Sequence, residues 1–171
     1  MSAKKKSLLI VWHSRTGAAQ QMAQEAARGA HDVVEQWQAQ EQLDVIIKPA
    51  HEVHAKDLLA AHAYLFSAPE NLAALSGEMK EFFDRNYYAV LGELNGRPYS
   101  LLVSAGTDGS QAVRQAERIA QGWRLQRAAP SHIVNTAAQT PEAILAPKTL
   151  TADDRAICHE AGGTLAALLL L

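Results

Sequence analysis

The segment from Ser7 to Ala30 places the strongest constraint on the fold. It begins with a continuous apolar run over residues 8–12 (LLIVW), which is typical of a strand buried on both faces of a parallel sheet. After residues 13–17 (HSRTG), alanines recur at spacings of three or four, which predicts a helix with one face on that sheet. Two hydroxyls, an arginine and a glycine therefore stand where the first amides of a helix point outward. This arrangement predicts an anion site suited to a phosphate.

Strand and helix patterns alternate along the rest of the chain. The predicted strands are residues 8–12, 43–48, 63–67, 99–104 and 132–135. The predicted helices begin after residue 17 and at residues 54, 76, 110 and 151, and the first is expected to run to about residue 40. This alternation predicts an α/β fold, a three-layer doubly wound five-stranded parallel sheet in the order 2-1-3-4-5. We expect one domain over residues 1–171, with residues 1–6 as a solvated basic tail.

Composition narrows the function classes. A hydrophobic share of 48% and a charged share of 20% are ordinary for a soluble globular protein, and a net charge of −2 argues against a nucleic-acid binder. With Cys158 as the single cysteine, no internal disulfide is possible, which favours a cytoplasmic location. We expect no signal peptide, and the closing run over residues 168–171 is too short to span a membrane.

Three polar or glycine-bearing loops follow predicted strands one, three and four. They are residues 13–17, 68–71 and 105–109. These strands are neighbours in the predicted order, and ligands of parallel sheets bind beyond the carboxyl ends of the strands. We therefore expect the three loops to form one pocket.

These loops also carry a family resemblance. Residues 14–17 (SRTG) resemble the phosphate loop of flavodoxin-like proteins, and residues 67–71 (SAPEN) with 76–85 (SGEMKEFFDR) resemble a stretch common in NAD(P)H-dependent FMN and quinone reductases. Residues 105–110 (AGTDGS) resemble the loop that lies against the flavin in that family. The sequence is therefore identified, by resemblance, as a member of the flavodoxin-like superfamily in its FMN reductase and quinone reductase branch.

The resemblance implies the cofactor and its contacts. FMN would be the cofactor and NAD(P)H the co-substrate, with hydride passing through the flavin N5 to a quinone, a nitro compound or free flavin. The residues assigned to the cofactor are Ser14, Arg15, Thr16, Gly17, Ala18 and Ala19 in the first loop, Pro69, Glu70, Asn71 and Leu72 in the second, and Ala105, Gly106, Thr107, Asp108 and Gly109 in the third. No side chain is needed as an acid or base, so no catalytic residue is assigned, and Glu70 and Asp108 are interpreted as groups that shape the pocket.

The sequence departs from the family pattern in two places. Ala18 and Ala19 stand where the phosphate loop usually offers polar side chains, so phosphate contact there is left to the backbone. Residues 72–75 (LAAL) stand where electron-transfer flavodoxins have a stacking aromatic. An open flavin face suits a reductase, since nicotinamide and acceptor must stack there in turn. The alternatives are a flavodoxin-type electron carrier and a flavodoxin-like protein with weak or lost FMN binding.

Other readings of single residues are less favoured. His51 and His54 lack further ligands, so no metal site is assigned. His13 is interpreted as a structural, hydrogen-bonded histidine, and Cys158 as a core residue beside an inward stripe of Ile157, Ala161, Leu165 and Leu168. The GxGxxG and GxSxG patterns are absent. As partners we expect a small-molecule electron acceptor, no nucleic acid or membrane, and a homodimer or tetramer.

Overall fold

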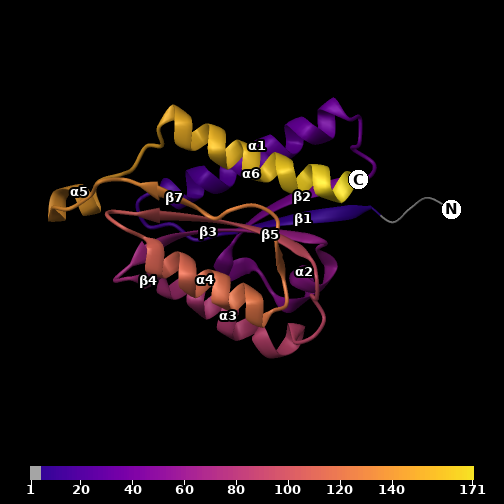
Figure 1. Ribbon diagram of the computed structural model, residues 1–171, viewed down its shortest axis with the longest axis horizontal. Coiled ribbons are helices and arrows are strands. Elements are labelled where there is room, and N and C mark those ends of the chain that lie inside the picture. The colour runs from indigo at the N-terminus through magenta and orange to yellow at the C-terminus, as the bar shows by residue number, and fades with distance from the viewer. Residues whose placement is uncertain (1–4) are drawn as a thin grey trace.

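A parallel β-sheet lies between two layers of helices (Figure 1). The computed structural model describes residues 5–171. Its strands are β1 (Lys6–Trp12), β2 (Leu43–Pro49), β3 (Ala63–Asn71), β4 (Ala74–Leu75), β5 (Pro98–Ala105), β6 (Gln126–Arg127) and β7 (His132–Asn135). Its helices are α1 (Ala18–Gln36), the 3-10 turn η1 (Ala50–Glu52), α2 (Ala55–Ala60), α3 (Gly77–Val90), α4 (Ser110–Gly122), α5 (Pro141–Leu145) and α6 (Ala152–Leu170).

The sheet confirms the predicted topology. Its path is β2-β1-β3-β5-β6, and β7 pairs in parallel with the carboxyl half of β5. All five predicted strands are present in the predicted order. The structure adds two short strands: β6 beside the start of β5, and β4, which pairs antiparallel with the end of β3. The residues that form β4 were expected to lie in a loop.

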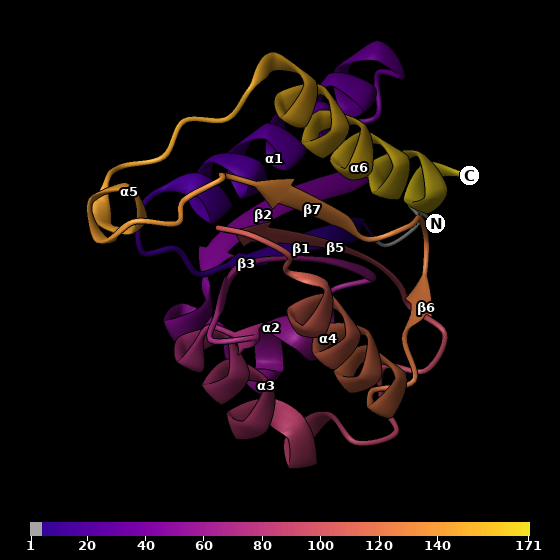
Figure 2. The same cartoon turned by 60° about the vertical axis from the view of Figure 1, so that its left-hand side comes forward.

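Each face of the sheet has its own apolar core. Helices α1 and α6 cover one face, and α2, α3 and α4 cover the other (Figure 2). Alternation along β5 shows the division, because Leu101 packs with α3 and α4 while Leu102 packs with α1 and α6. Parallel strands covered on both faces are expected to read as continuous apolar runs, as β1 and β3 do.

Two glycines let α1 and α6 lie in direct backbone contact. A Cβ built at Gly162 would stand 1.8 Å from the Ala26 carbonyl oxygen, and one at Gly29 would stand 1.9 Å from the His159 carbonyl oxygen. The sequence left open whether Gly162 marks close packing or a break in the helix. It marks close packing.

Several sequence-based details were wrong. Helix α1 ends at Gln36 rather than near residue 40. The inward face of α6 is rotated from the predicted stripe: Ile157 and Leu168 are exposed, and the buried residues are Cys158, Gly162, Leu165, Ala166 and Leu169. Cys158 is thus a core residue as expected, and burial raises the pKa of its thiol to about 12.

The predicted basic tail is shorter than expected. Lys6 is the first residue of β1, and its Nζ donates to the Leu169 carbonyl at 2.6 Å, while Lys5 pairs with Asp44. The remainder of the predicted tail, residues 1–4, lies outside the described residues. Among residues 5–171, no helix is long and apolar enough to cross a membrane.

Candidate functional site

The first loop connects β1 to α1 and forms an anion cradle. Ser14 Oγ accepts a hydrogen bond from the Gly17 amide at 3.1 Å, and Gly17 starts the helix with a φ of +99°. The first helical bond runs from the Gln21 amide to the Gly17 carbonyl at 3.1 Å. The amides of residues 18–20 therefore precede the hydrogen-bonded ladder and remain donors at the positive end of the helix. The side chains of Ala18 and Ala19 are buried, so only their backbone can serve a ligand there.

Ser67, at the carboxyl end of the β3 core segment, holds this loop in place. Its buried hydroxyl donates to the Ala19 carbonyl at 2.7 Å, and its own carbonyl accepts from the His13 amide at 3.0 Å. One residue of β3 thus ties the loop on both sides of the cradle. Ser67 was not predicted as a site residue, although its hydroxyl at the end of an apolar strand was a signal for it.

Four side chains form a polar network beside the cradle. His13 Nδ1 lies 2.8 Å from Ser76 Oγ, so the hydroxyl of this N-cap residue of α3 bonds to His13 and not to an amide of the helix. Arg15 NH2 donates to both carboxylate oxygens of Glu78, at 3.2 and 3.3 Å, and His13 Nε2 lies 3.6 Å from the same carboxylate. His13 is hydrogen-bonded, as its structural interpretation requires.

The pKa shifts in this network fix its charges. Burial lowers the pKa of His13 below its ordinary value of 6.5, which outweighs the opposing field of Glu78. The pKa of Glu78 is also lowered, first by a hydrogen bond from its own backbone amide and further by His13 and Arg15. At neutral pH the network therefore holds a neutral His13 imidazole and a Glu78 carboxylate.

The second loop is a tight hairpin rather than the expected open loop. Strand β3 continues to Asn71 and turns back into β4 through Leu72 and Ala73, whose φ angles are +52° and +63°. Glu70 Oε1 accepts from the Ala73 amide at 2.5 Å, so this carboxylate holds the turn. The Leu72 side chain is fully exposed at the tip. The hairpin is fastened to α4 by the Gln115 side chain, which accepts from the Leu75 amide at 2.7 Å.

The third loop follows β5 and starts α4. Asp108 accepts from the Ser110 amide at 3.3 Å and from the Ser110 hydroxyl, so its carboxylate is bonded to the first residue of α4. Gly109 is buried with a φ of +73°, a conformation that favours glycine. Gly106 has no room for a side chain because the chain returns over it: a Cβ there would stand 2.6 Å from the Ala138 carbonyl oxygen. The backbone structure thus explains why both positions are glycine. Gly106 to Asp108 are the residues of this loop that reach the surface.

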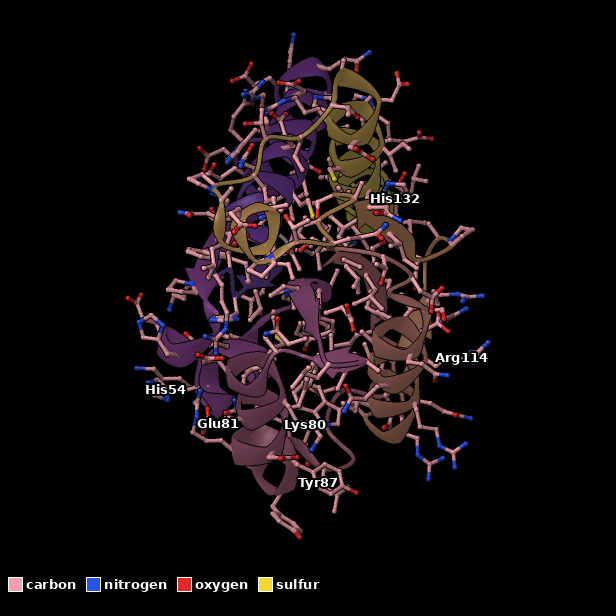
Figure 3. All side chains as sticks on the ribbon, turned by 90° about the vertical axis from the view of Figure 1, so that its left-hand side faces the viewer. His54, Lys80, Glu81, Tyr87, Arg114 and His132 are labelled. Atoms are coloured by element: carbon pink, nitrogen blue, oxygen red, sulfur yellow. The ribbon has the colours of Figure 1, made fainter. Side chains whose placement is uncertain are left out.

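The fold brings all three loops to one edge. Strands β1, β3 and β5 are adjacent and parallel, so their carboxyl ends meet there. Figure 3 looks onto this edge, with α1 and α6 above it and α3 and α4 below. The structure therefore places the sequence-predicted site residues along one face of the molecule, and it leaves their contact with FMN as a prediction.

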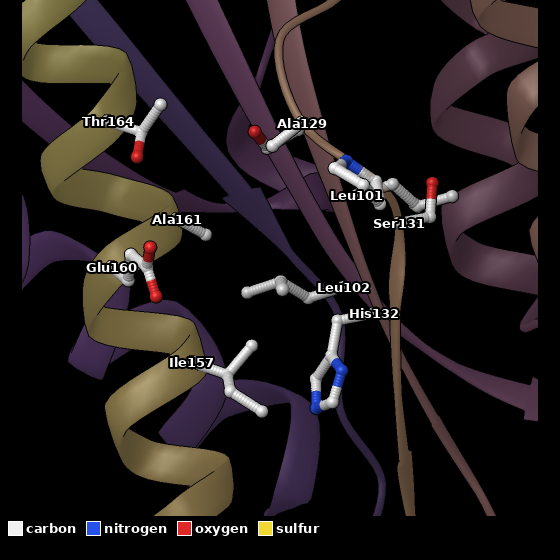
Figure 4. A pocket seen from close by; sticks show the side chains of 11 residues that line it. Leu101, Leu102, Ala129, Ser131, His132, Ile157, Glu160, Ala161 and Thr164 are labelled. Carbon is white, nitrogen blue, oxygen red and sulfur yellow. The ribbon is translucent and has the colours of Figure 1, made fainter.

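Two other features lie apart from this edge. A cavity of about 270 Å³ is bordered by α6, by the middle of β5 and by the segment before β7 (Figure 4). Its lining residues include Glu160 of α6 and His132 at the start of β7. It therefore borders the middle of β5 rather than its carboxyl end. Of the two histidines considered for a metal, His54 starts α2 and His51 lies 3.6 Å from Glu52, and residues 5–171 contain no cluster of metal-binding side chains.

Known structures share this fold along nearly their whole length. The chain superposes on a flavodoxin from the domain Archaea with a TM-score of 0.73 at 17% identity, covering 96% of this chain and 99% of that one. An oxidoreductase from Corynebacterium diphtheriae gives a TM-score of 0.72 at 20% identity, with 98% of each chain covered. A WrbA-like flavodoxin from Agrobacterium tumefaciens gives 0.71 at 13%, covering 97% and 98%. The fold is that of the flavodoxin-like class.

Sequence comparison then identifies the family. Residues 13–140 match the family of NADPH-dependent FMN reductases, so the chain belongs to that family. It is also 29% identical over 99 residues to a protein of Aquifex aeolicus named flavodoxin, a match covering 58% of this chain and 50% of the relative. The matched part thus spans about half the length of that relative.

Proposed function

We propose that the protein binds FMN at this edge and is an NAD(P)H-dependent oxidoreductase that reduces a small acceptor, such as a quinone, a nitro compound or free flavin. The observation that supports the proposal most directly is the anion cradle at the start of α1, whose free amides lie at the same sheet edge as two further strand-end loops. Membership of the FMN reductase family supports the same cofactor.

The residues at the edge fit the chemical parts of FMN. A phosphate is matched by the amides of residues 18–20, by the positive end of α1 and by the exposed guanidinium of Arg15. The exposed backbone from Gly106 to Asp108 and the hairpin backbone near Glu70 offer the polar groups that a flavin ring requires. One feature opposes the fit, since Glu78 places a negative charge beside Arg15.

The chain's own task is binding and orientation. FMN supplies hydride transfer at N5 when it is bound. The carboxylates of Glu70 and Asp108 are engaged in the turns that they stabilise, which agrees with their interpretation as shaping groups. The proposed reaction therefore needs no acid or base from the chain.

The hairpin tip favours a reductase over an electron carrier. Its turn residues, Leu72 and Ala73, are exposed and carry no aromatic ring, so a flavin beside them would keep one face open to a nicotinamide and then to an acceptor. The net charge of −2 also lacks the strong acidity of a protein that docks onto redox partners. An electron carrier is the second candidate, because the chain is similar to a protein named flavodoxin.

Gly17 provides the test of the cofactor site. Gly17→Ala forces a side chain into a left-handed position within the cradle, and we expect the Kd for FMN to rise at least about tenfold, with about 1 kcal/mol of lost stability. Gly92→Ala is the matched control, because Gly92 has a φ of +78° with nothing within 4 Å of its Cβ and follows α3, which runs away from this edge. Equal FMN affinities in the two variants would contradict the proposed site.

The enzymatic part requires a separate assay. With FMN bound, the excess removed and oxygen excluded, the protein should turn over NADPH or NADH catalytically only when a quinone, a nitro compound or free flavin is supplied, and Gly17→Ala should lose this activity in proportion to its bound FMN. A protein that binds FMN but oxidises neither nucleotide would favour the electron carrier. The homodimer or tetramer stays a prediction.

A further inference from the structure

The connection from β7 to α6, residues 136–150, forms a strap across the candidate cofactor edge. It leaves the outer side of the sheet, passes through α5 at the far end of the molecule and returns toward the start of α1 (Figures 1 and 2). The family match ends at residue 140, so α5 and the returning segment lie beyond it. The strap contacts two of the three candidate cofactor loops.

The strap's first anchor is the loop after β5. The Thr136 amide donates to the Ala105 carbonyl at 2.8 Å, and the Asn135 side chain donates to the Thr107 carbonyl. Because Gly106 has no side chain, the backbone of Ala138 lies directly on it. This anchor fixes where the strap crosses the third loop.

The second anchor is the phosphate loop. The Lys148 amide donates to the Thr16 carbonyl at 2.8 Å. In a helix extended by one residue, that carbonyl would accept from the Gln20 amide. By occupying it, the strap leaves the Gln20 amide at the open end of the cradle.

Gln21 fastens this anchor with both ends of its side-chain amide. Its Nε2 donates to the Lys148 carbonyl at 2.7 Å and to the Gly17 carbonyl at 3.0 Å. Its Oε1 accepts from the Leu150 amide at 3.4 Å and from Arg155 NH2 at 3.3 Å. A single side chain on the first turn of α1 thus connects the phosphate loop, both sides of the strap's return and α6.

The ammonium group of Lys148 stabilises the conformation of the strap. Lys148 Nζ donates to the carbonyls of Ala143 and Ile144 at 2.8 and 3.0 Å and to that of Ala146. A cation at the carboxyl end of α5 is favourable, and it ties the short helix to the residue that contacts Thr16. The strap is therefore anchored as one unit.

We propose that Gln21 is a positioning residue for the cofactor, which fastens the strap to the phosphate loop and so keeps the cradle in its anion-binding shape. The inference rests on the proposed function. It gives the strap a role at the loop where Ala18 and Ala19 offer no side-chain donors. Binding of FMN and docking of the strap then favour each other, because coupling between two binding events is reciprocal.

Gln21→Leu removes the hydrogen bonds of the Gln21 side-chain amide at nearly constant side-chain volume. Gln24→Leu is the matched control, because Gln24 lies one turn along α1 and is exposed. Hydrogen exchange of the Lys148 and Leu150 amides is measured without FMN, and the Kd for FMN is measured by fluorescence quenching. We expect Gln21→Leu to speed exchange and raise the Kd, each about tenfold, which corresponds to 1.4 kcal/mol. Gln24→Leu should change neither.

A folded Gln21→Leu protein with unchanged exchange, or with fast exchange and an unchanged Kd, overturns the inference while leaving the proposed function intact. If that variant does not fold, the wild-type protein decides the matter, because added FMN must slow exchange at Lys148 and Leu150, and unchanged exchange overturns the inference. Wild-type protein that binds no FMN contradicts the proposed function itself, and the positioning role with it.

Discussion

Arg15 and Glu78 form an ion pair beside the candidate phosphate cradle, with the guanidinium NH2 at 3.2 Å from one carboxylate oxygen. Both side chains are about half exposed, so the pair contributes little to stability. Its importance is electrostatic. The carboxylate offsets a cation that a phosphate would otherwise use, and the lowered pKa of Glu78 keeps it charged at neutral pH.

Glu78→Gln should therefore tighten FMN binding. Releasing Arg15 from its pair is expected to lower the Kd about threefold, in the range of exposed charge interactions, and the gain should shrink at high salt. Glu81→Gln, which releases Arg85 one turn along α3, serves as the control and should leave the Kd unchanged. A weaker affinity in Glu78→Gln would show that the carboxylate assists binding, against this account.

His13 should make stability depend on pH. Its pKa in the folded protein lies below the ordinary 6.5, so the unfolded chain takes up the proton first as pH falls. The contribution of neutral His13 to the free energy of unfolding is intact above pH 6.5 and is lost as the pH falls through the pKa of His13 in the folded protein. His13→Gln should thus lose less free energy of unfolding than the wild type between about pH 7.5 and pH 5. Denaturant titrations at the two pH values measure this, and equal losses in His13→Gln and the wild type would contradict it.

Gly162→Ala should force α1 and α6 apart. Its Cβ would stand 1.8 Å from the Ala26 carbonyl oxygen, a backbone atom that cannot rotate away. We expect a loss of about 3 kcal/mol in the free energy of unfolding, at the upper end of overpacking effects. Gly122→Ala has nothing within 4 Å and should be neutral or gain up to about 1 kcal/mol. Similar stabilities of the two variants would contradict the close approach of the helices.

Alanine substitution at two buried serines should change the free energy of unfolding in opposite directions. Ser100 Oγ is buried without a hydrogen-bond partner among the described residues, so Ser100→Ala should stabilise the protein by about 1 kcal/mol. Ser67→Ala removes the bond to the Ala19 carbonyl and should destabilise by about 1–2 kcal/mol. Chemical denaturation of both variants tests the prediction, and a destabilised Ser100→Ala would show that this hydroxyl has a partner after all.

Local patterns were sufficient to predict the sheet. Apolar runs such as residues 8–12 mark strands that are buried on both faces, and right-handed crossovers restrict their order, so the topology and the edge where the three loops meet could be predicted. The position of the first loop was predictable too, since Gly17 and its neighbours stand between a strand pattern and a helix pattern. That these residues contact FMN remains a prediction.

Long-range contacts were not predictable. Gln21 and Lys148 are 127 positions apart, and nothing in either neighbourhood indicates that the strap returns to the cradle. The predicted inward face of α6 was wrong because the polar residues are spread around the first half of the helix and the last turns are apolar, so the periodicity does not select a side. The choice is made by Gly162, where only a bare Cα fits against the backbone of Ala26. The hairpin at Leu72 and Ala73 was missed because its turn uses residues that rarely adopt left-handed angles.

A visible absorbance spectrum tests FMN binding and reduction together: excess FMN is added to the purified protein, the unbound fraction is removed, and NADPH is then added without oxygen. We expect one retained FMN per chain, a shifted flavin band, and bleaching when NADPH is added. Protein that retains no flavin under these conditions would contradict the proposed cofactor site, and retained flavin that ignores both NADPH and NADH would contradict the reductase.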